Sequence, residues 1–274
     1  MLPDDPQLRA RYQSAIRWAR QAGAHTLNHF QRDTYQVSCK TDGSPVTQAD
    51  RETEQLLRRL IKAEYPGDGI VGEEFGEEAG TTPFRWIVDP IDGTKSFIGG
   101  VPLYGTLVAV QYEQRSVIGV IEIPGLHERV YAAAGCGAWH VRCDDAPRPA
   151  RVSTASSLSD GILLTSDIQG FVEREAGAAW QKLEDASWYA RTWGDCYGYL
   201  LVATGRAVVM IDPQLNLWDA AAVQIVIEEA GGRFTDWQGR PRIDSGDAIA
   251  TTAGVIDEIL SITRTVPPQS GPKR

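Results

Sequence analysis

Acidic side chains stand at the ends of several segments whose apolar neighbours predict buried strands or helices. Asp89 and Asp92 close the run RWIVDPID, and the acids of GEE (72–74) follow the apolar pair Ile70-Val71. Asp219 begins a helix, AAAVQIVIEEA, that is apolar on nearly every side. Because an unpaired carboxylate is costly to bury, such groups are paired, exposed or bound to metal. Acids at the ends of these elements, with only oxygen-type ligands nearby, match a hard cation such as Mg²⁺ or Mn²⁺.

The turn after this strand, Asp92-Gly93-Thr94, predicts the start of a helix. Backbone N–H groups at such a start favour an anion such as phosphate. One loop could therefore offer carboxylates to cations and amides to phosphate. The structural alternative is that Asp92 caps the helix, Asp89 makes a turn and Asp219 is a plain N-cap. Acids at the ends of several elements favour metal-assisted phosphoryl transfer to water.

The elements that must position these acids fall into blocks. Residues 7–31 predict a long amphipathic helix, and residues 52–66 predict a second helix. Short β-rich runs then predict a mostly antiparallel sheet, and the second half alternates strands and helices. This order indicates layered α+β packing rather than a Rossmann fold, and the chain has no GxGxxG or Walker pattern.

The domain organisation predicted from composition is a single catalytic unit over residues 1–265. Turn residues within 141–151 mark a joint between an N-terminal lobe, about 1–147, and a C-terminal lobe, about 148–265. The Pro-rich residues 266–274 are expected to form a disordered tail.

Charge and composition exclude several classes of function. The net charge of −9 over 274 residues argues against a protein whose main partner is nucleic acid. Neither a signal peptide nor an apolar run long enough to span a membrane is present. The four cysteines form no CxxC pair, which favours reduced thiols in a cytoplasmic protein.

Two of the four histidines, His25 and His29, stand four residues apart in the first predicted helix. They could share a metal, but their segment holds no acidic partner, which favours a packed or solvated helix face. All four histidines lie outside the acidic segments. The sequence therefore offers no Ser–His or Cys–His nucleophile, and direct attack by water is favoured over a covalent intermediate.

Over almost its whole length the chain resembles the inositol monophosphatase-like, Mg²⁺-dependent and lithium-sensitive phosphatases. The resemblance rests on four segments in the same order: KTDGSPVTQAD (40–50), GEE (72–74), DPIDGT (89–94), and WD (218–219) followed by EAGG (229–232). It implies a layered αβαβα fold, a homodimer and hydrolysis of a small phosphorylated metabolite.

The resemblance also implies a set of metal ligands. Glu74, Asp89 and the carbonyl group of Ile91 would hold one Mg²⁺, and Asp89, Asp92 and Asp219 would hold a second. A third, looser ion would lean on Glu74, and Mn²⁺ could replace Mg²⁺.

The phosphate and the attacking water have implied partners of their own. Gly93 and Thr94 would donate backbone N–H groups to the phosphate. Thr94, hydrogen-bonded to Asp50, and Glu74 would orient the water, and Lys40 would lie on a loop near the third ion.

Further segments resemble the histidinol-phosphate phosphatase branch, namely GVPLYGTL (100–107), RTWGDCYGY (191–199) and IDPQLNLWD (211–219). They imply four substrate contacts, from Tyr104, Arg191, Asp195 and Asp212. Histidinol carries an ammonium group and an imidazole, so acids in its pocket would favour it over a polyol. In the alternative, Asp195 is the N-cap of a helix over 195–204 and Asp212 makes a turn before Pro213.

The function expected from these features is hydrolysis of L-histidinol phosphate, a step of histidine biosynthesis, by metal-activated water. Within the same class, the alternatives are an inositol-1-phosphate phosphatase and a 3′(2′),5′-bisphosphate nucleotidase. In a different class, the chain would be a non-catalytic regulator that binds a metal or an anion. The enzyme is favoured because none of the implied catalytic groups is missing: Glu74, Asp89, Asp92, Thr94 and Asp219.

Overall fold

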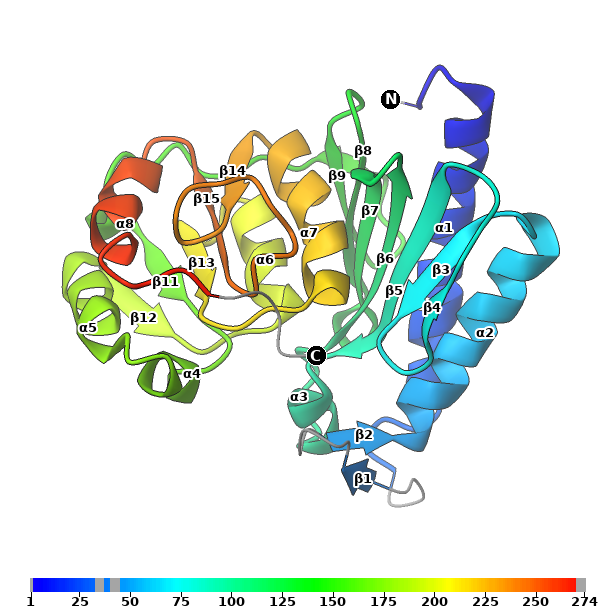
Figure 1. Ribbon diagram of the computed structural model, residues 1–274, viewed down its shortest axis with the longest axis horizontal. Helices are drawn as coiled ribbons and strands as arrows, with labels where there is room; N and C mark the ends of the chain where they lie inside the picture. The colour runs from blue at the N-terminus through cyan, green and yellow to red at the C-terminus, as the bar shows by residue number, and fades with distance from the viewer. Residues whose placement is uncertain (1, 33–36, 40–44, 270–274) are drawn as a thin grey trace.

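The chain folds into five alternating layers of helices and sheets, as Figure 1 shows for the computed structural model. The structure describes residues 2–32, 37–39 and 45–269. The outer helices on one side are α1 (Pro6–Thr26) and α2 (Gln48–Glu64), and the central ones are α6 (Cys196–Ala203) and α7 (Leu217–Glu229). The far layer holds α4 (Gln169–Glu173), α5 (Gly177–Ala186) and α8 (Ile256–Thr263). The predicted layered α+β fold is thus confirmed.

An eight-stranded sheet lies between the outer and the central helices, in the order β10-β9-β8-β7-β6-β5-β3-β4. Its strands are β3 (Gly69–Gly72), β4 (Gly76–Glu78), β5 (Phe84–Asp92), β6 (Gly105–Tyr112), β7 (Arg115–Ile123), β8 (Glu128–Ala133), β9 (Ala138–Arg142) and β10 (Arg148–Pro149). Among the described strands of this sheet, only β3 and β5 pair in parallel, with Gly72 opposite Val88. The carboxyl ends of these two strands therefore meet at one edge of the sheet, where the acids of GEE and DPID follow.

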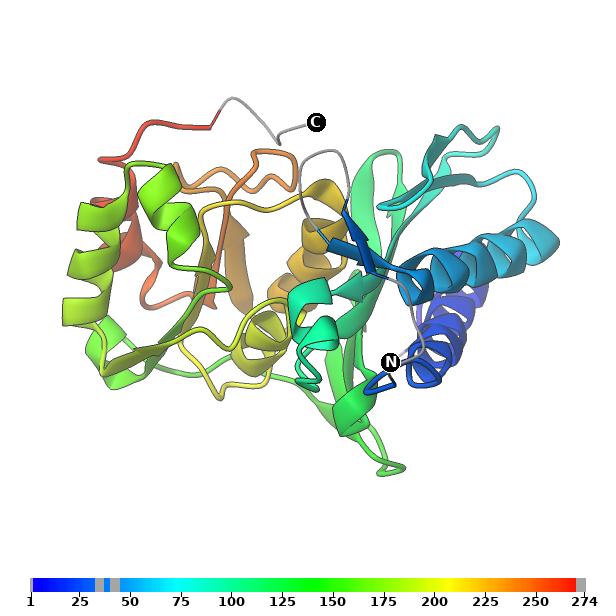
Figure 2. The ribbon, with the colours of Figure 1, turned by 90° about the horizontal axis from the view of Figure 1, so that it is seen from below.

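A five-stranded sheet lies on the other side of the central helices, in the order β12-β11-β13-β15-β14. Its strands are β11 (Ile162–Leu164), β12 (Tyr189–Arg191), β13 (Val209–Asp212), β14 (Gly232–Thr235) and β15 (Ala248–Thr252). A separate antiparallel pair, β1 (Val37–Cys39) and β2 (Pro45–Thr47), precedes α2. Figure 2 places the short helix α3 (Thr94–Ile98) at the junction between the halves that contain the two sheets.

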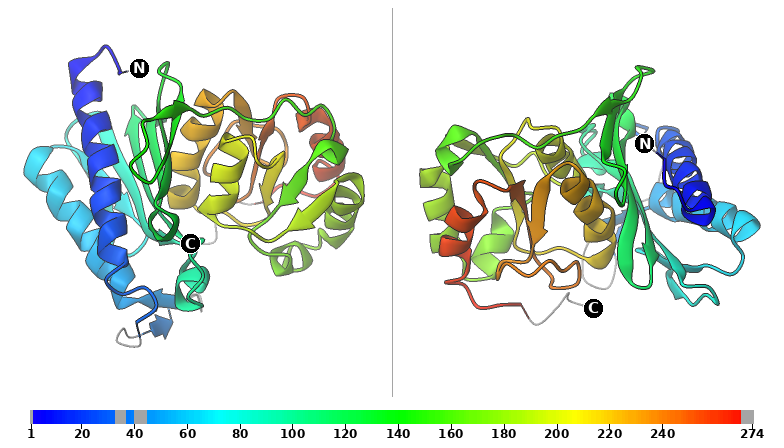
Figure 3. Two further views of the ribbon diagram at one scale, coloured as in Figure 1. Left: turned by 180° about the vertical axis from the view of Figure 1, so that it is seen from behind. Right: turned by 90° about the horizontal axis from the view of Figure 1, so that it is seen from above.

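Three apolar clusters fill the spaces between the layers. One packs α1 and α2 against the eight-stranded sheet and includes Trp18 and Trp86. A second lies between the two sheets, around α6 and α7, and includes Tyr199. The third lies under α4, α5 and α8 and includes Phe171 and Trp237. Figure 3 shows the helical layers on both faces of the eight-stranded sheet. This packing fixes the edge at which the acids gather.

The observed elements differ from the sequence prediction in a few places. Helix α2 begins at Gln48 rather than at residue 52, because Thr47 and Asp50 form a reciprocal capping box. In the second half, where alternating strands and helices were predicted, α4 and α5 follow each other directly as two separate helices, since Glu175 between them has a left-handed φ of 58°. Val266, assigned to the tail by composition, is buried in the third apolar cluster.

No helix among the described residues is long and apolar enough to cross a lipid bilayer. Three cysteines, Cys136, Cys143 and Cys196, are in the free thiol form.

Candidate active site

The end of β5 positions the first two acids. The pairing of β5 with β6 shifts register between Asp89 and Asp92, so the strand leaves the sheet irregularly there. Asp89 is only 1% exposed, and its Oδ1 accepts a hydrogen bond from the N–H of Ile91 at 3.0 Å. The Oδ2 of Asp92 accepts from the N–H of Cys196, the first residue of α6, at 2.6 Å. Both carboxylates are therefore fixed by backbone donors.

The third acid comes from α7, and it completes what we call the aspartate cluster: Asp89, Asp92 and Asp219. One carboxylate oxygen of each lies within 4.8 Å of the others. The N-cap of α7 is Asn216 rather than Asp219, and the Oδ2 of Asp219, in the first turn of the helix, accepts from the N–H of Asn216 at 2.9 Å. The cap and the cluster are compatible, because a carboxylate has a second oxygen that remains available.

Burial and repulsion among the carboxylates raise the pKa values of this cluster. Burial, together with the charges of Glu73, Asp92 and Asp219, raises the pKa of Asp89 well above its usual value. The pKa of Asp92 is likewise raised well above its usual value by burial and by the charges of Asp195 and Asp219. Burial raises the pKa of Asp219 to about 6. Three such carboxylates can be ionised together only when cations neutralise them.

The cluster lines a cavity of about 470 Å³. Its walls are formed by Pro45, Glu73, Asp89, Ile91, Asp92, Gly93, Thr94, Lys95, Ser96, Ser166, Asp167, Asp195, Asn216 and Asp219. A second cavity of about the same volume, 470 Å³, lies beside Trp188 and Arg206, and Asp160 is its only acidic wall residue. Volume does not distinguish the two cavities, whereas the gathering of carboxylates singles out the first.

The turn into α3 needs the glycine that the sequence supplies. Gly93 has a left-handed φ of 88°, and it is the N-cap of α3. A Cβ atom at this position would lie 2.7 Å from the Oδ2 of Asp195. Glycine is therefore required both for the backbone conformation and for the close approach of Asp195. Residues 93–96, the start of α3, line the cavity beside the aspartate cluster.

The predicted contact between Thr94 and Asp50 is present. The Thr94 Oγ1 donates toward the Asp50 Oδ1 at 3.3 Å and has the carbonyl oxygen of Ile91 at 3.2 Å as an alternative acceptor. The other carboxylate oxygen of Asp50 accepts from the N–H and the Oγ1 of Thr47, at 2.7 and 2.5 Å. Because both possible partners are acceptors, Thr94 must donate, and its own lone pairs remain available to a water molecule.

Glu73, not Glu74, is the acid that the structure brings to the cavity. Its charge raises the pKa of Asp89, so the two carboxylates are close. Glu74, which was predicted as a metal ligand, is not among the residues that line the cavity. The backbone N–H of Glu74 is held by the buried Glu54 Oε2 at 2.7 Å, which turns the chain after β3.

Glu54 is a positioning residue that the sequence prediction missed. Its Oε1 accepts from the N–H of Phe75 at 3.2 Å and from the Nε of Arg58 at 2.8 Å. A Cβ atom on Gly72 would collide with this carboxylate, which explains the glycine before the two glutamates. The signal in the sequence was an acid three residues before Leu57, on the apolar face of α2.

Of the predicted substrate contacts, Asp195 lines the cavity. Asp212 lies behind the wall instead, where it is 1% exposed and accepts from the N–H of Ser166 at 2.8 Å and the Oη of Tyr199 at 2.7 Å. Burial raises the pKa of Asp212 to about 6. Asp212 therefore positions Ser166, which does line the cavity. The cavity residues Ser166, Asp167 and Asn216 were not predicted.

Tyr104 and Arg191 are also placed elsewhere by the structure. Tyr104 is fully buried, and its Oη is 3.1 Å from the Oγ1 of Thr26. Arg191 is exposed and lies over the ring of Tyr189, 4.8 Å from its centroid. Neither lines the cavity, because Tyr104, just before β6, points to Thr26 at the end of α1, and β12 lies at the edge of the far sheet. The remaining predicted residue, Lys40, lies outside the described residues.

A layered αβαβα fold with acids gathered at a sheet edge defines a class of metal-dependent phosphatases, and comparison with known proteins identifies the family. Residues 7–265 match the sequence profile of the inositol monophosphatase family. The chain belongs to this family.

Individual relatives agree with this assignment. A histidinol-phosphatase of Chlorobaculum parvum is 41% identical over 239 residues, which cover 87% of this chain and 90% of that protein. A histidinol-phosphatase of Mycobacterium tuberculosis is 38% identical over 249 residues, covering 90% and 95%. Among solved structures, an IMPase from Thermotoga maritima superposes with a TM-score of 0.84 at 29% identity, covering 94% of this chain and 98% of its own.

Proposed function

We propose that this chain is a Mg²⁺-dependent phosphomonoesterase that hydrolyses L-histidinol phosphate to L-histidinol and phosphate. The observation that carries the proposal is the aspartate cluster beside the start of α3, in one cavity. The two histidinol-phosphatases, at 41% and 38% identity, support the choice of substrate.

The donor set fits magnesium. The aspartate cluster and Glu73 offer only carboxylate oxygens, and the raised pKa of Asp89 marks a site that lacks positive charge. Hard cations prefer such oxygen ligands. We assign Glu73, Asp89, Asp92, Asp219 and the carbonyl group of Ile91 as ligands, with Mn²⁺ as a possible substitute. When bound, Mg²⁺ neutralises phosphate oxygens and lowers the pKa of water.

The side chains around the cluster orient the reactants. Thr94, held as a donor by Asp50, accepts a hydrogen bond from water, which turns a lone pair of that water toward the phosphorus. Backbone N–H groups at the start of α3 bind the phosphate oxygens. No side-chain nucleophile takes part, so the phosphoryl group passes directly to water.

The wall of the cavity outside the aspartate cluster selects the alcohol portion. Asp167 and Asp195 belong to this wall, and Asp195 is close to Gly93. Two carboxylates at this position favour a substrate with an ammonium group, as in histidinol. Inositol-1-phosphate is the second candidate, because the same wall carries Ser166 and Asn216, which suit a polyol.

Other properties implied by the family resemblance remain proposals. We expect inhibition by Li⁺, a cytoplasmic location, a role in histidine biosynthesis and a homodimer. Removal of divalent ions should abolish phosphate release, and added Mg²⁺ should restore it. Phosphate release that is indifferent to chelation would contradict the metal mechanism.

Substrate choice is tested by phosphate release from histidinol phosphate, inositol-1-phosphate and adenosine 3′,5′-bisphosphate. We expect the highest kcat/KM with histidinol phosphate. The D195N variant should lose at least about tenfold in kcat/KM for this substrate and less for inositol-1-phosphate. The matched control is D160N, in the other cavity, which should change neither value. A preference for inositol-1-phosphate in the unmodified protein would refute the substrate assignment.

A further inference from the structure

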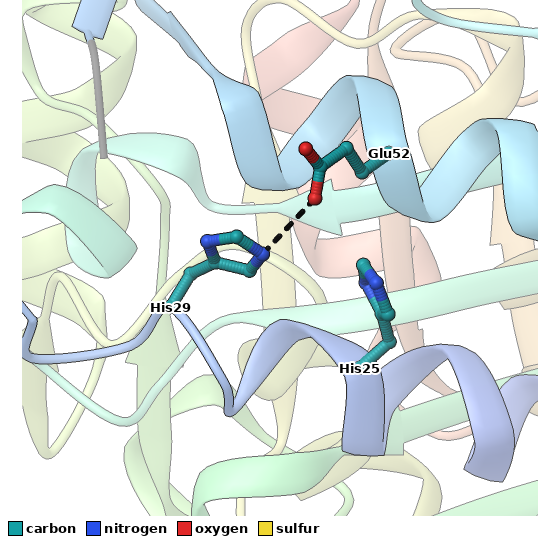
Figure 4. A group of neighbouring side chains, drawn as sticks. All are labelled: His25, His29 and Glu52. Atoms are coloured by element: carbon teal, nitrogen blue, oxygen red, sulfur yellow. Dashed lines mark ion pairs between the residues drawn. The ribbon is translucent and has the colours of Figure 1, made fainter. Parts of the chain in front are cut away.

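A second group of potential metal ligands lies outside the candidate active site. We call it the histidine cluster: His25, His29 and Glu52. One ligating atom of each lies within 4.8 Å of the others. Figure 4 shows the two imidazoles, from the end of α1 and the turn after it, facing the carboxylate of Glu52 on α2. The His29 Nε2 is 3.3 Å from the Glu52 Oε2, and the imidazole centroids are 5.7 Å apart.

The local backbone explains why the two histidines share one face. Helix α1 ends at Thr26, but a tighter turn continues it, with the N–H of Asn28 bonded to the carbonyl of His25 at 3.1 Å. The N–H of His29 bonds to the carbonyl of Thr26 at 3.0 Å. A spacing of four residues across such turns places both imidazoles side by side. The sequence showed this pair, whereas the acid that completes it comes from another helix.

Two groups of the cluster, His25 and Glu52, are each oriented by a neighbour outside it. The His25 Nδ1 lies 3.0 Å from the Oγ1 of the buried Thr53, which leaves its Nε2 for a ligand. The Oε1 of Glu52 accepts from the Nε2 of Gln48, so its Oε2 faces His29. One ring nitrogen held by an outer partner while the other stays available is the usual arrangement of a ligating histidine.

We propose that His25, His29 and Glu52 bind a transition-metal ion of the Zn²⁺ type, with water completing its coordination. Two imidazole nitrogens and one carboxylate oxygen are a known zinc donor set, and they are poor ligands for Mg²⁺. The side chains of His29 and Glu52 are 19% and 40% exposed, so an ion can reach them from solvent. Burial lowers the pKa of His25, which favours the neutral ring that a metal requires.

An ion at this place would join the end of α1 to the beginning of α2. Next to His29, Phe30 packs against Phe97 and Tyr104, with ring centroids 5.6 and 5.0 Å away. Next to Glu52 on α2, Asp50 holds Thr94. The ion would therefore stabilise the positions of Phe30 and Asp50, which contact residues of α3, without taking part in the reaction.

The test is a calorimetric titration of Zn²⁺ into tag-free protein with Mg²⁺ in excess, so that the aspartate cluster is saturated. Because Cys143 is exposed and could itself bind zinc, every variant carries C143S. We expect one equivalent of Zn²⁺ to bind, and H25A or H29A to weaken binding at least about tenfold. The control is H127N, at an exposed histidine with a left-handed φ of 51° that asparagine tolerates.

A second measurement follows thermal unfolding. Zn²⁺ should raise the midpoint of the C143S protein and of H127N, and should leave that of H29A unchanged. If H25A fails to fold, His29, whose side chain is partly exposed, supplies the test through H29N. Zinc binding to H29A or H29N as tight as to the control would overturn the proposal, and so would the absence of any zinc binding to the C143S protein.

Discussion

The aspartate cluster and the histidine cluster bring potential metal ligands together in two different ways. In the first, burial and like charges raise the pKa of Asp89 and of Asp92. In the second, an imidazole stands opposite a carboxylate, and His29 and Glu52 can form an ion pair of 3.3 Å by themselves. The carboxylates of the aspartate cluster repel one another until cations arrive, whereas the histidine cluster holds a single carboxylate and has no such repulsion.

Their surroundings differ as much as their ligands do. Beside the aspartate cluster stand the turn at Gly93 and the start of α3, within one cavity. The histidine cluster has packed helices around it, with Thr53 and Gln48 as its polar neighbours. A metal ion can therefore act on a phosphate only at the aspartate cluster. At the histidine cluster it can only stabilise the packing of α1 against α2.

The largest effect is expected from the variant D89N, which tests whether the two clusters act independently. It removes a ligand that we assign to two ions, so kcat should fall on the order of 1000-fold. It also removes one of three repelling charges, so the metal-free variant should unfold at a higher temperature than the metal-free parent. Zinc binding at the histidine cluster should be unchanged. Rate assays and melting curves measure these effects, and turnover close to that of the parent would end the metal mechanism.

A smaller loss is expected from G93A. The Cβ atom would approach the Asp195 Oδ2 to 2.7 Å and would strain a φ of 88°. We expect kcat/KM to fall about 10- to 100-fold through displacement of the phosphate-binding turn. The control is G135A, at a φ of 73° with nothing within 4 Å of the added atom. G135A should lower stability only, and an equal loss of kcat/KM in both variants would show that backbone strain alone is responsible.

Another buried carboxyl group, Glu122, sharpens the contrast because it lies outside both clusters. Burial raises its pKa from 4.5 to about 7, and the nearest ion-pairing atom, the Nη1 of Arg129, is 3.9 Å away. Since the folded protein binds this proton more tightly than the unfolded chain, ionisation lowers stability as the pH rises from 4.5 to about 7.

The variant E122Q should therefore be more stable than the parent above about pH 7, by on the order of 1–3 kcal/mol. Near the lower end of the range the two should be equal. Denaturant unfolding across this pH range measures the difference, and Mg²⁺ should not alter it. A stabilisation that is independent of pH would rule out ionisation of Glu122 as its cause.

The smallest effect is expected from Y104F. The hydroxyl group of Tyr104 contacts Thr26 inside the core, so its removal should cost about 1 kcal/mol of stability. The KM for histidinol phosphate should stay within about threefold of the parent value. A large rise in KM without loss of stability would restore Tyr104 as a substrate contact.

The sequence predicted the layers because periodicity is a local pattern, and it predicted the aspartate cluster because each acid stands at the end of an apolar run and the family resemblance joins the three segments. Periodicity reveals helices and strands, and an acid at the end of an apolar run, such as Asp89, is visible in one segment. The features that the sequence predicted less well depend on the direction in which a side chain points. Glu73 and Glu74 are adjacent, and only the turn held by Glu54 decides which of them enters the cavity.

The same limit explains the misplaced substrate contacts and the incomplete histidine pair. Asp212 is near the site in sequence, but Tyr199 and Ser166 hold its carboxylate behind the wall. Glu52 belongs to a different helix from His25 and His29, so no local pattern could join them. Contacts between elements require the packed structure.

The hydrogen bond from Cys196 to Asp92 joins residues 104 positions apart, and Asp219 lies further along the chain. During synthesis at roughly 5–20 residues per second, β5 is therefore made about ten seconds before its last partner. Throughout that interval a nascent chain carries the two aspartates of β5 without the third acid or the backbone donor that fixes them. Tight binding of a metal ion at the aspartate cluster would consequently be a late event in folding, and it would report that the second half of the chain has been made and has docked.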